Sequence, residues 1–195
     1  MNFVALDFET ANNSPTSICQ IGLSVFENGK VVENKSFYVK PYPYYFASSN
    51  IAVHGIDYSV VANMPTFPQY WQHIMHYFDN RIMIAHNASF DFKVLYKSLT
   101  YFGLEMPTIE FYCTLLISKR LLKGYPSYSL HNLCSNFGID FTHHDAAEDA
   151  QAAGLLMLQI LQKNQFYSIK ELAQNYNFKK GIINPTTFLN FSTKK

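Results

Sequence analysis

Acidic residues and histidines occur at three places in the sequence where their spacing could support chemistry. Asp7 and Glu9 are two residues apart in FVALDFE, Asp91 ends IAHNASFD, and His144 precedes Asp149 in HHDAAEDAQAAGLL. Carboxylate oxygens are the ligands that Mg²⁺ and Mn²⁺ favour, and an imidazole titrates near neutral pH and can move a proton. The residue types therefore favour divalent-cation chemistry, provided that the fold brings the three segments together.

The first pair lies on an expected strand. Alternation in FVALDFE predicts a strand over residues 3–9 whose apolar residues share one face while Asp7 and Glu9 share the other. Two adjacent carboxylates repel each other and resist burial, and a bound divalent cation would relieve both costs. A strand end that exposes both acids to water explains the same pair without a metal.

The second acid follows a short apolar strand, RIMIA. NASFDFKVLYKSLTYFG predicts a helix over residues 87–103, with Asn87 as its N-cap and Gly103 at its end. If RIMIA lies in the same sheet as residues 3–9, Asp91 emerges near the carboxyl ends of the strands, where α/β folds place their sites. The alternative role of Asp91 is to stabilise the positive end of the helix dipole.

The third segment opens a strongly predicted helix. Asp145 and Glu148 match a capping box, in which an acceptor at the N-cap is followed three residues later by Glu. His144 and Asp149 then occupy the two positions that touch in a hydrophobic staple, so we expect the two to be neighbours. His143 lies further from the helix and is expected to face solvent without a functional role.

The elements that would carry these residues alternate in type. Residues 17–40 predict a β-hairpin around Asn28-Gly29, and the Pro- and Tyr-rich residues 41–56 predict a loop. Apolar periodicity predicts helices over residues 65–79, 114–122, 129–137, 145–163 and 168–176. Residues 177–195 show no clear pattern. Three strands followed by helices that alternate with short strands predict a mixed α/β sheet.

Length and charge suggest one domain with a basic extension. A chain of 195 residues with 48% hydrophobic composition can bury a substantial core. Residues 163–195 contain six lysines and one glutamate, whereas residues 1–162 contain nine basic and thirteen acidic residues. We therefore expect a domain over residues 1–163 and a basic extension over residues 164–195 that packs on the domain or frays. A basic segment also suggests a polyanionic partner.

The cysteines and the hydropathy pattern bear on location. Cys19, Cys113 and Cys134 are odd in number and show no CxxC spacing, which is typical of free thiols in a reducing cytosol. No apolar run has the length of a membrane span, and MNFVALDFET does not match a signal peptide. We expect a cytoplasmic protein that does not bind a membrane.

In this order and on these elements, the three motifs resemble those of the DEDDh 3′–5′ exonucleases, the family of the proofreading epsilon subunit of bacterial DNA polymerase III. LDFET corresponds to the first motif, AHNASFD to the second and HHDAAED to the third. The sister DEDDy group has Tyr four positions before the last Asp, where this chain has Asp145. His144, five positions before that Asp, assigns the chain to the h type. The resemblance covers about residues 3–160.

The resemblance implies a ribonuclease H-like fold, with a mixed sheet of about five strands flanked by helices, and two divalent cations, Mg²⁺ or Mn²⁺. It implies that Asp7 contacts both ions, that Glu9 and Asp149 join it at one ion, and that Asp91 acts partly through water. His144 would accept a proton from the attacking water. An imidazole with a pKa near neutrality suits that role.

The resemblance also implies substrate contacts by six further residues: Phe8, Thr10, His54, Ile56, Asn87 and Phe90. His54 and Ile56 belong to an HGI segment whose apolar residue would lie beside the last base. Ile56 and Phe90 could instead belong to the core, and Asn87 could act only as a helix cap. Two departures stand out: many members have a small polar residue in place of Phe8, and Asp-Thr in place of Cys113-Thr114.

The expected function is hydrolysis at the 3′ ends of single-stranded nucleic acid, with release of nucleoside 5′-monophosphates and DNA favoured over RNA. One alternative is an RNA-directed exoribonuclease of the same fold. Another is a binding subunit that docks to a polymerase or another protein partner. Loss of a site acid would have favoured the binding subunit, and all four acids are present.

Overall fold

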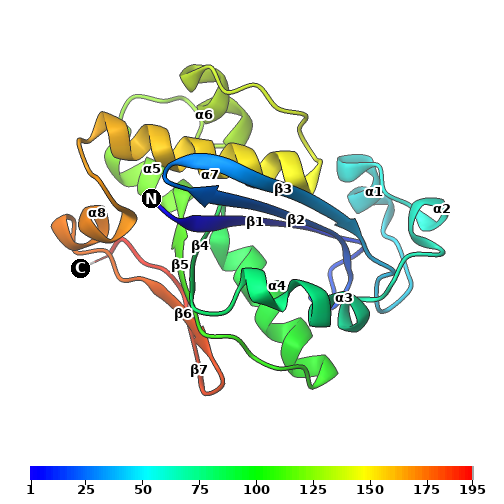
Figure 1. The fold of residues 1–195 in the computed structure, drawn as a ribbon. Coiled ribbons are helices and arrows are strands. Elements are labelled where there is room, and N and C mark those ends of the chain that lie inside the picture. The colour runs from blue at the N-terminus through cyan, green and yellow to red at the C-terminus, as the bar shows by residue number, and fades with distance from the viewer. Residues whose placement is uncertain (195) are drawn as a thin grey trace.

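Seven strands form one mixed sheet in the computed structural model, which describes residues 1–194 (Figure 1). Their order across the sheet is β3-β2-β1-β4-β5-β6-β7. The strands are β1 (Phe3–Thr10), β2 (Ile18–Glu27), β3 (Lys30–Tyr38), β4 (Arg81–Ala85), β5 (Ile109–Cys113), β6 (Gly181–Asn184) and β7 (Thr187–Leu189).

Helices connect the strands and cover both faces of the sheet (Figure 1). They are α1 (Ser48–His54), α2 (Tyr58–Val61), α3 (Phe67–Ile74), the 3₁₀ helix η1 (Met75–Tyr77), α4 (Ala88–Phe102), α5 (Thr114–Leu121), α6 (Leu130–Phe137), α7 (Ala146–Lys163) and α8 (Ile169–Asn175). Among the described residues, no helix has the length and apolarity needed to cross a membrane.

The sheet register places the acidic strand at the centre. β1 pairs antiparallel with β2, which sets Asp7 opposite Gly22 and Glu9 opposite Gln20. On its other side β1 is parallel to β4, and β4 is parallel to β5. Because β1 and β4 run in the same direction, the end of β1 and the turn after Ala85 meet at one edge of the sheet. This confirms the expected α/β architecture.

Helix α7 packs against one face of the sheet and α4 against the other (Figure 1). α7 approaches β2 closely because two glycines lie in the contact. An added Cβ would lie 1.8 Å from the Ala146 oxygen at Gly22 and 2.2 Å from the Phe26 ring at Gly154. On the α4 side, the Phe92 ring stacks on Phe111 of β5, with ring centroids 4.1 Å apart.

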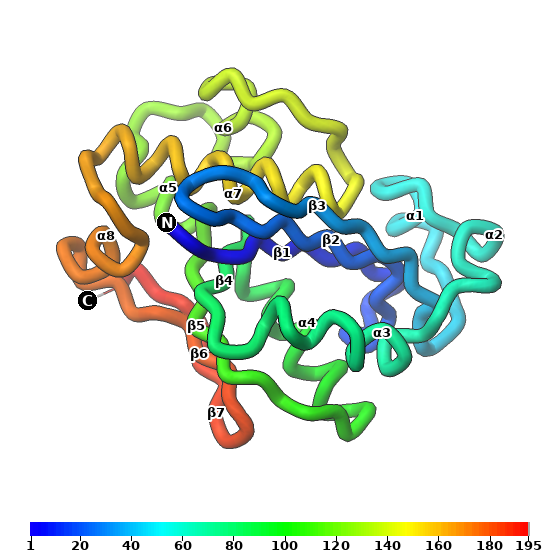
Figure 2. Tube along the Cα trace, viewed as in Figure 1, coloured from blue at the N-terminus to red at the C-terminus, as the bar shows by residue number. Residues whose placement is uncertain are grey.

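The sheet has seven strands, not the expected number of about five. β6 pairs antiparallel with β5, and β7 with β6, so the C-terminal hairpin extends the sheet beyond β5 (Figure 2). The two strands are four and three residues long, too short for a period-two pattern to be recognised. Ile183 of β6 is fully buried in the main core.

One further expectation was wrong. Residues 48–54, within the expected loop, form α1. None of the helix residues is buried, so apolar periodicity could not mark it. The helix ends at Gly55, whose left-handed backbone (φ 72) caps it and begins the HGI turn.

Candidate active site

Three carboxylates meet where β1 and α7 come together. One carboxylate oxygen each of Asp7, Glu9 and Asp149 lies within 4.8 Å of the other two. Asp91, in the first turn of α4, is buried beside them, and its Oδ1 accepts a hydrogen bond of 3.1 Å from the Phe8 N–H of β1. The three sequence motifs, separated by up to 142 positions from Asp7 to Asp149, therefore form one cluster.

The four acids share an environment that opposes ionisation. Burial, together with the charges of Asp91 and Asp149, raises the pKa of Asp7 well above its ordinary value. Burial raises the pKa of Glu9 to about 7 and that of Asp91 to about 8. A cation would remove the repulsion and favour the charged forms. The donor set, made of carboxylates only and either buried or half-buried, fits hard divalent cations such as Mg²⁺ or Mn²⁺.

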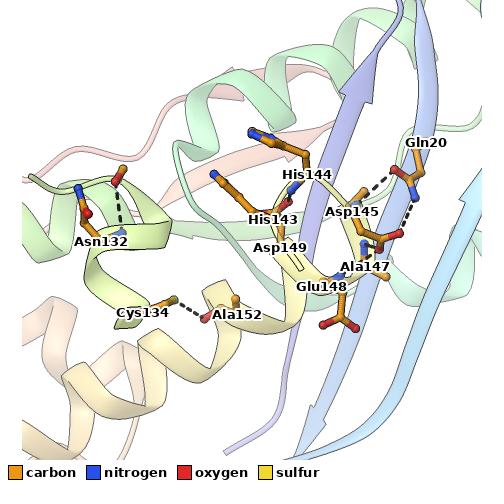
Figure 3. A network of polar contacts seen from close by, with 12 residues as sticks. Gln20, Asn132, Cys134, His143, His144, Asp145, Ala147, Glu148, Asp149 and Ala152 are labelled. Carbon is orange, nitrogen blue, oxygen red and sulfur yellow. Dashed lines mark hydrogen bonds and ion pairs between the residues drawn. The ribbon is translucent and has the colours of Figure 1, made fainter. Parts of the chain in front are cut away.

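The loop before α7 engages Asp149 through two different histidines (Figure 3). Nδ1 of His143 lies 3.0 Å from Oδ1 of Asp149, and the backbone N–H of His144 donates to Oδ2 at 2.8 Å. His144 has a positive φ of 67°, and its ring stacks on that of His143 with centroids 3.9 Å apart. His143 is therefore not a bystander: its side chain is 40% exposed, but its ring contacts the Asp149 carboxylate.

The expected cap at α7 is present in part. Asp145 accepts hydrogen bonds from the N–H groups of Ala147 (3.0 Å) and Glu148 (3.3 Å). The Glu148 carboxylate makes no return bond to Asp145 in the described chain, so the capping box is one-sided. Gln20 of β2 takes its place, donating to Asp145 Oδ2 (3.2 Å) and accepting from the Ala146 N–H (3.3 Å) (Figure 3). This bridge holds the helix end on the sheet.

Two cavities of about 610 Å³ each open beside the acids. The first contains Asp7, Glu9, Asp91 and Asp149, and its wall includes Asn87 and Phe90. Asn87 stands at the N-cap of α4, as expected, but with a left-handed backbone and no capping hydrogen bond from its side chain. Phe90 is exposed and lines both cavities.

The second cavity extends from Glu9 along the segment that follows β1, and Thr10 and His54 line it. The Thr10 carbonyl accepts a hydrogen bond of 2.7 Å from Asn50, and it lies 3.2 Å from His54 Nε2. His54 Nδ1 accepts from the Ile56 N–H at 3.0 Å, which orients the ring toward Thr10. Burial lowers the pKa of His54, which favours the neutral ring.

Two of the expected substrate contacts lie largely in the interior. Ile56 is only 4% exposed and packs in a small apolar cluster that includes Ala11 and Cys19, outside both cavities. Phe8 lies in the main core, although it borders both cavities. Val53, 52% exposed on α1, lines both cavities and supplies the apolar surface expected of Ile56. The sequence interpretation missed Val53 because α1 was taken for a loop.

A second group that the sequence did not reveal supports the cavity wall. The buried His86 ring lies 2.9 Å from Thr114 Oγ1 and 3.0 Å from the Tyr128 carbonyl. Burial lowers the pKa of His86 to about 4, so the ring is neutral. The Thr114 hydroxyl also donates to the Ala85 carbonyl of β4 (3.3 Å), so Thr114 and His86 together link β4, α5 and the Tyr128 loop, while the neighbouring Cys113 is buried. The replacement of Asp by Cys before this Thr leaves that link in place.

Comparisons with known proteins indicate that the chain belongs to a family of exonucleases. A family model described as exonuclease (RNase_T) matches residues 4–157. The 3′-5′ exonuclease DinG of Bacillus subtilis is 29% identical over 96% of this chain, which spans 20% of that protein's length. The DNA polymerase III subunit epsilon of Buchnera aphidicola is 28% identical over 91% of this chain, and the match covers 80% of that protein.

Solved structures show the same fold. Exonuclease X, in a complex with 5′ overhanging duplex DNA, superposes with a TM-score of 0.72 at 25% identity, covering 88% of this chain and 97% of that one. The nuclease domain of 3′hExo, described as a DEDDh family member bound to rAMP, superposes with a TM-score of 0.66 over 83% of this chain and 92% of that chain. At 14% identity the second likeness concerns the fold alone.

Proposed function

Because the chain belongs to the RNase_T exonuclease family and carries the acids and the histidine of the DEDDh motifs, we propose that it hydrolyses phosphodiester bonds at the 3′ ends of single-stranded nucleic acid and releases nucleoside 5′-monophosphates. The observation that carries this proposal is the meeting of Asp7, Glu9 and Asp149 within 4.8 Å, beside His144 and two open cavities. A binding-only subunit would have no need of four acids whose ionisation the fold opposes.

The four carboxylates would hold two divalent cations, Mg²⁺ or Mn²⁺, with Asp7 contacting both. When bound, the cations would neutralise the phosphate charge, lower the pKa of the attacking water and stabilise the leaving oxygen. Asp149 is oriented for this role by its two bonds to the His143–His144 segment. Asp91 is oriented by the Phe8 N–H, which ties it to the strand that carries Asp7.

His144 would accept the proton of the attacking water. Burial and the neighbouring His143 lower the pKa of His144, so that the ring is neutral and able to accept a proton at physiological pH. The backbone bond from His144 to Asp149 fixes the position of the residue relative to the carboxylates while leaving its ring free. That arrangement suits a general base.

The terminal nucleotide would occupy the cavity lined by Thr10, His54 and Phe90. Phe90 and Val53 expose ring and methyl surfaces on which any base can stack, and stacking of this kind tolerates all sequences. We propose DNA as the preferred substrate, because one relative is a subunit of DNA polymerase III and exonuclease X is described in a complex with DNA. An RNA-directed enzyme is the second candidate, since the motifs are shared by both groups.

The relatives also suggest a protein partner for this chain. Subunit epsilon is a part of DNA polymerase III, and we propose that this chain can act beside a polymerase or another protein partner. The three cysteines are free and buried, which supports a reducing, cytoplasmic compartment. Residues 164–194 contribute α8, β6 and β7, and we propose that they complete the domain.

The test is degradation of matched 5′-labelled single-stranded DNA, double-stranded DNA and RNA with Mg²⁺ or Mn²⁺. We expect shortening from the 3′ end of the DNA single strand and release of 5′-monophosphates. Asp7→Asn and His144→Asn should abolish it while the proteins remain folded, whereas Asp140→Asn, an exposed acid, serves as the matched control. Activity that survives both site substitutions would disprove the proposal, and faster loss of RNA would favour the second candidate.

A further inference from the structure

A second group of metal-binding side chains lies next to the carboxylate cluster. One ring nitrogen each of His143 and His144 and a carboxylate oxygen of Asp149 all lie within 4.8 Å of one another. The positive φ of His144 turns the chain so that the two consecutive rings stack on the same side of the loop (Figure 3). A histidine pair in an extended strand would point to opposite faces, so this backbone is what brings the two rings together.

The donor chemistry of this group differs from that of the four acids. Two imidazoles and one carboxylate are a set that Zn²⁺ and related transition-metal ions favour, whereas Mg²⁺ prefers oxygen ligands alone. Three protein ligands leave a fourth position open in a tetrahedral site. The His143 side chain is 40% exposed, so an ion can reach the group from solvent.

Asp149 belongs to both groups, as it lies within 4.8 Å of Asp7 and Glu9 and also of the two histidines. We propose that His143, His144 and Asp149 form a separate binding site for a transition-metal ion of the Zn²⁺ class, and that an ion bound there inhibits the enzyme. The ion would bind the ring of His144, which the proposed hydrolysis needs as a proton acceptor, and would compete for Asp149 with the cations held by the four carboxylates. The inhibitory part rests on the proposed function, whereas the binding part does not.

The binding part is tested on the whole 195-residue chain, with Mg²⁺ in about tenfold or greater excess throughout so that the carboxylate site is supplied with its own ion. Competition with a chromophoric chelator measures Zn²⁺ affinity, and the visible absorption of Co²⁺ reports imidazole ligands. His143→Asn keeps a side-chain donor near the Nδ1 position for Asp149 but removes the imidazole. His131→Ala is the matched control, because its ring stacks on His143 with centroids 5.7 Å apart but lies outside the group.

We expect the native chain and His131→Ala to bind one Zn²⁺ with equal affinity. His143→Asn should weaken binding by at least about tenfold, since even the loss of an outer-sphere partner of a metal ligand costs that much. Equal Zn²⁺ affinity in His143→Asn and the native chain, or an equal loss in His131→Ala, would overturn the site. Thermal unfolding of each variant without metal verifies that the fold is intact.

Nuclease assays then test inhibition separately. Zn²⁺ should inhibit the native chain in saturating Mg²⁺, and the inhibiting concentration should rise at least about tenfold in His143→Asn, in parallel with the loss of binding. Zn²⁺ bound at the site without inhibition would overturn the regulatory part. If the native chain has no nuclease activity, the proposed function fails, yet the chelator competition still decides whether the site exists.

Discussion

Gly22 of β2 lies directly beneath the carbonyl group of Ala146, the first residue of α7: a Cβ on Gly22 would be 1.8 Å from that oxygen. Gly22 is also the cross-strand partner of Asp7. The absence of a side chain on β2 therefore allows the first turn of α7, which carries Asp149, to rest on the strand pair beside Asp7. Gln20 secures the same helix end by its bonds to Asp145 and Ala146.

Gly22→Ala should therefore lower kcat strongly while it lowers the free energy of unfolding only moderately. The new methyl group must displace the start of α7, at a cost of about 1–3 kcal/mol in unfolding free energy, and must separate Asp149 from Asp7. Gly154→Ala is the control, because it presses α7 against the Phe26 ring at 2.2 Å, away from the acids. We expect both variants to unfold at lower temperature but only Gly22→Ala to lose most of its kcat. Equal kcat values in the two folded variants would contradict this account.

The two neighbouring histidines should differ in their effect on turnover. His144→Asn should lower kcat by about 10²–10⁴-fold, the usual contribution of a general base. His143→Asn retains a donor for Asp149, so its fold-loss in kcat should be smaller than that of His144→Asn by a factor of about ten or more. Single-turnover rates with labelled single-stranded DNA measure the difference. A larger loss of kcat in His143→Asn than in His144→Asn would indicate that the His143 ring, which contacts Asp149, accepts the proton.

Removal of divalent cations should make stability depend on pH. The folded-state pKa values of Glu9 (about 7) and Asp91 (about 8) are raised, so the native protein keeps protons that the unfolded chain has already released. The contribution that these protonated carboxyl groups make to the free energy of unfolding is complete at low pH and is lost as the pH rises through these pKa values. Between about pH 7 and pH 8, where the unfolded chain holds few histidine protons, one retained proton corresponds to about 1.4 kcal/mol.

Thermal unfolding in EDTA should accordingly show Tm falling by about 3–6 °C across that pH interval. Saturating Mg²⁺ should flatten the dependence, because it favours the ionised carboxylates. Asp91→Asn should reduce the slope in EDTA, since it removes the group with the higher of the two pKa values. A Tm that is constant or rising over the interval in EDTA would show that the acids are not held in the protonated form.

The C-terminal strands should contribute to stability. Ile183 of β6 is fully buried opposite Ile109 of β5, so Ile183→Ala should destabilise the protein by about 2–5 kcal/mol. Leu189→Ala in β7 changes an exposed side chain and should stay within about 0.5 kcal/mol of the native protein. Urea unfolding measures both. An equally small effect of Ile183→Ala would indicate that residues 164–195 are an appendage and not a part of the core.

Local sequence patterns were sufficient to predict the strands and helices that carry the acids. Period-two alternation identified β1, Asn28-Gly29 identified the β2–β3 turn, and Asp145 identified the start of α7. These features depend on a few neighbouring residues, which is why they can be read without a fold. α1 and the C-terminal strands were not predicted, because α1 has no buried residue and the strands are only four and three residues long, too little for a periodic signal.

The sequence by itself determined which acids and imidazoles are present, their order along the chain and the elements that bear them. Only the tertiary structure decided which atoms meet. The ring of His143, and not that of His144, hydrogen-bonds to Asp149, because the positive φ of His144 offers its backbone N–H to that carboxylate instead. Val53 and not Ile56 reaches the cavities, because Ile56 is taken up by the small core beside Cys19. Backbone conformation and competition for burial depend on distant parts of the chain, which no local pattern contains.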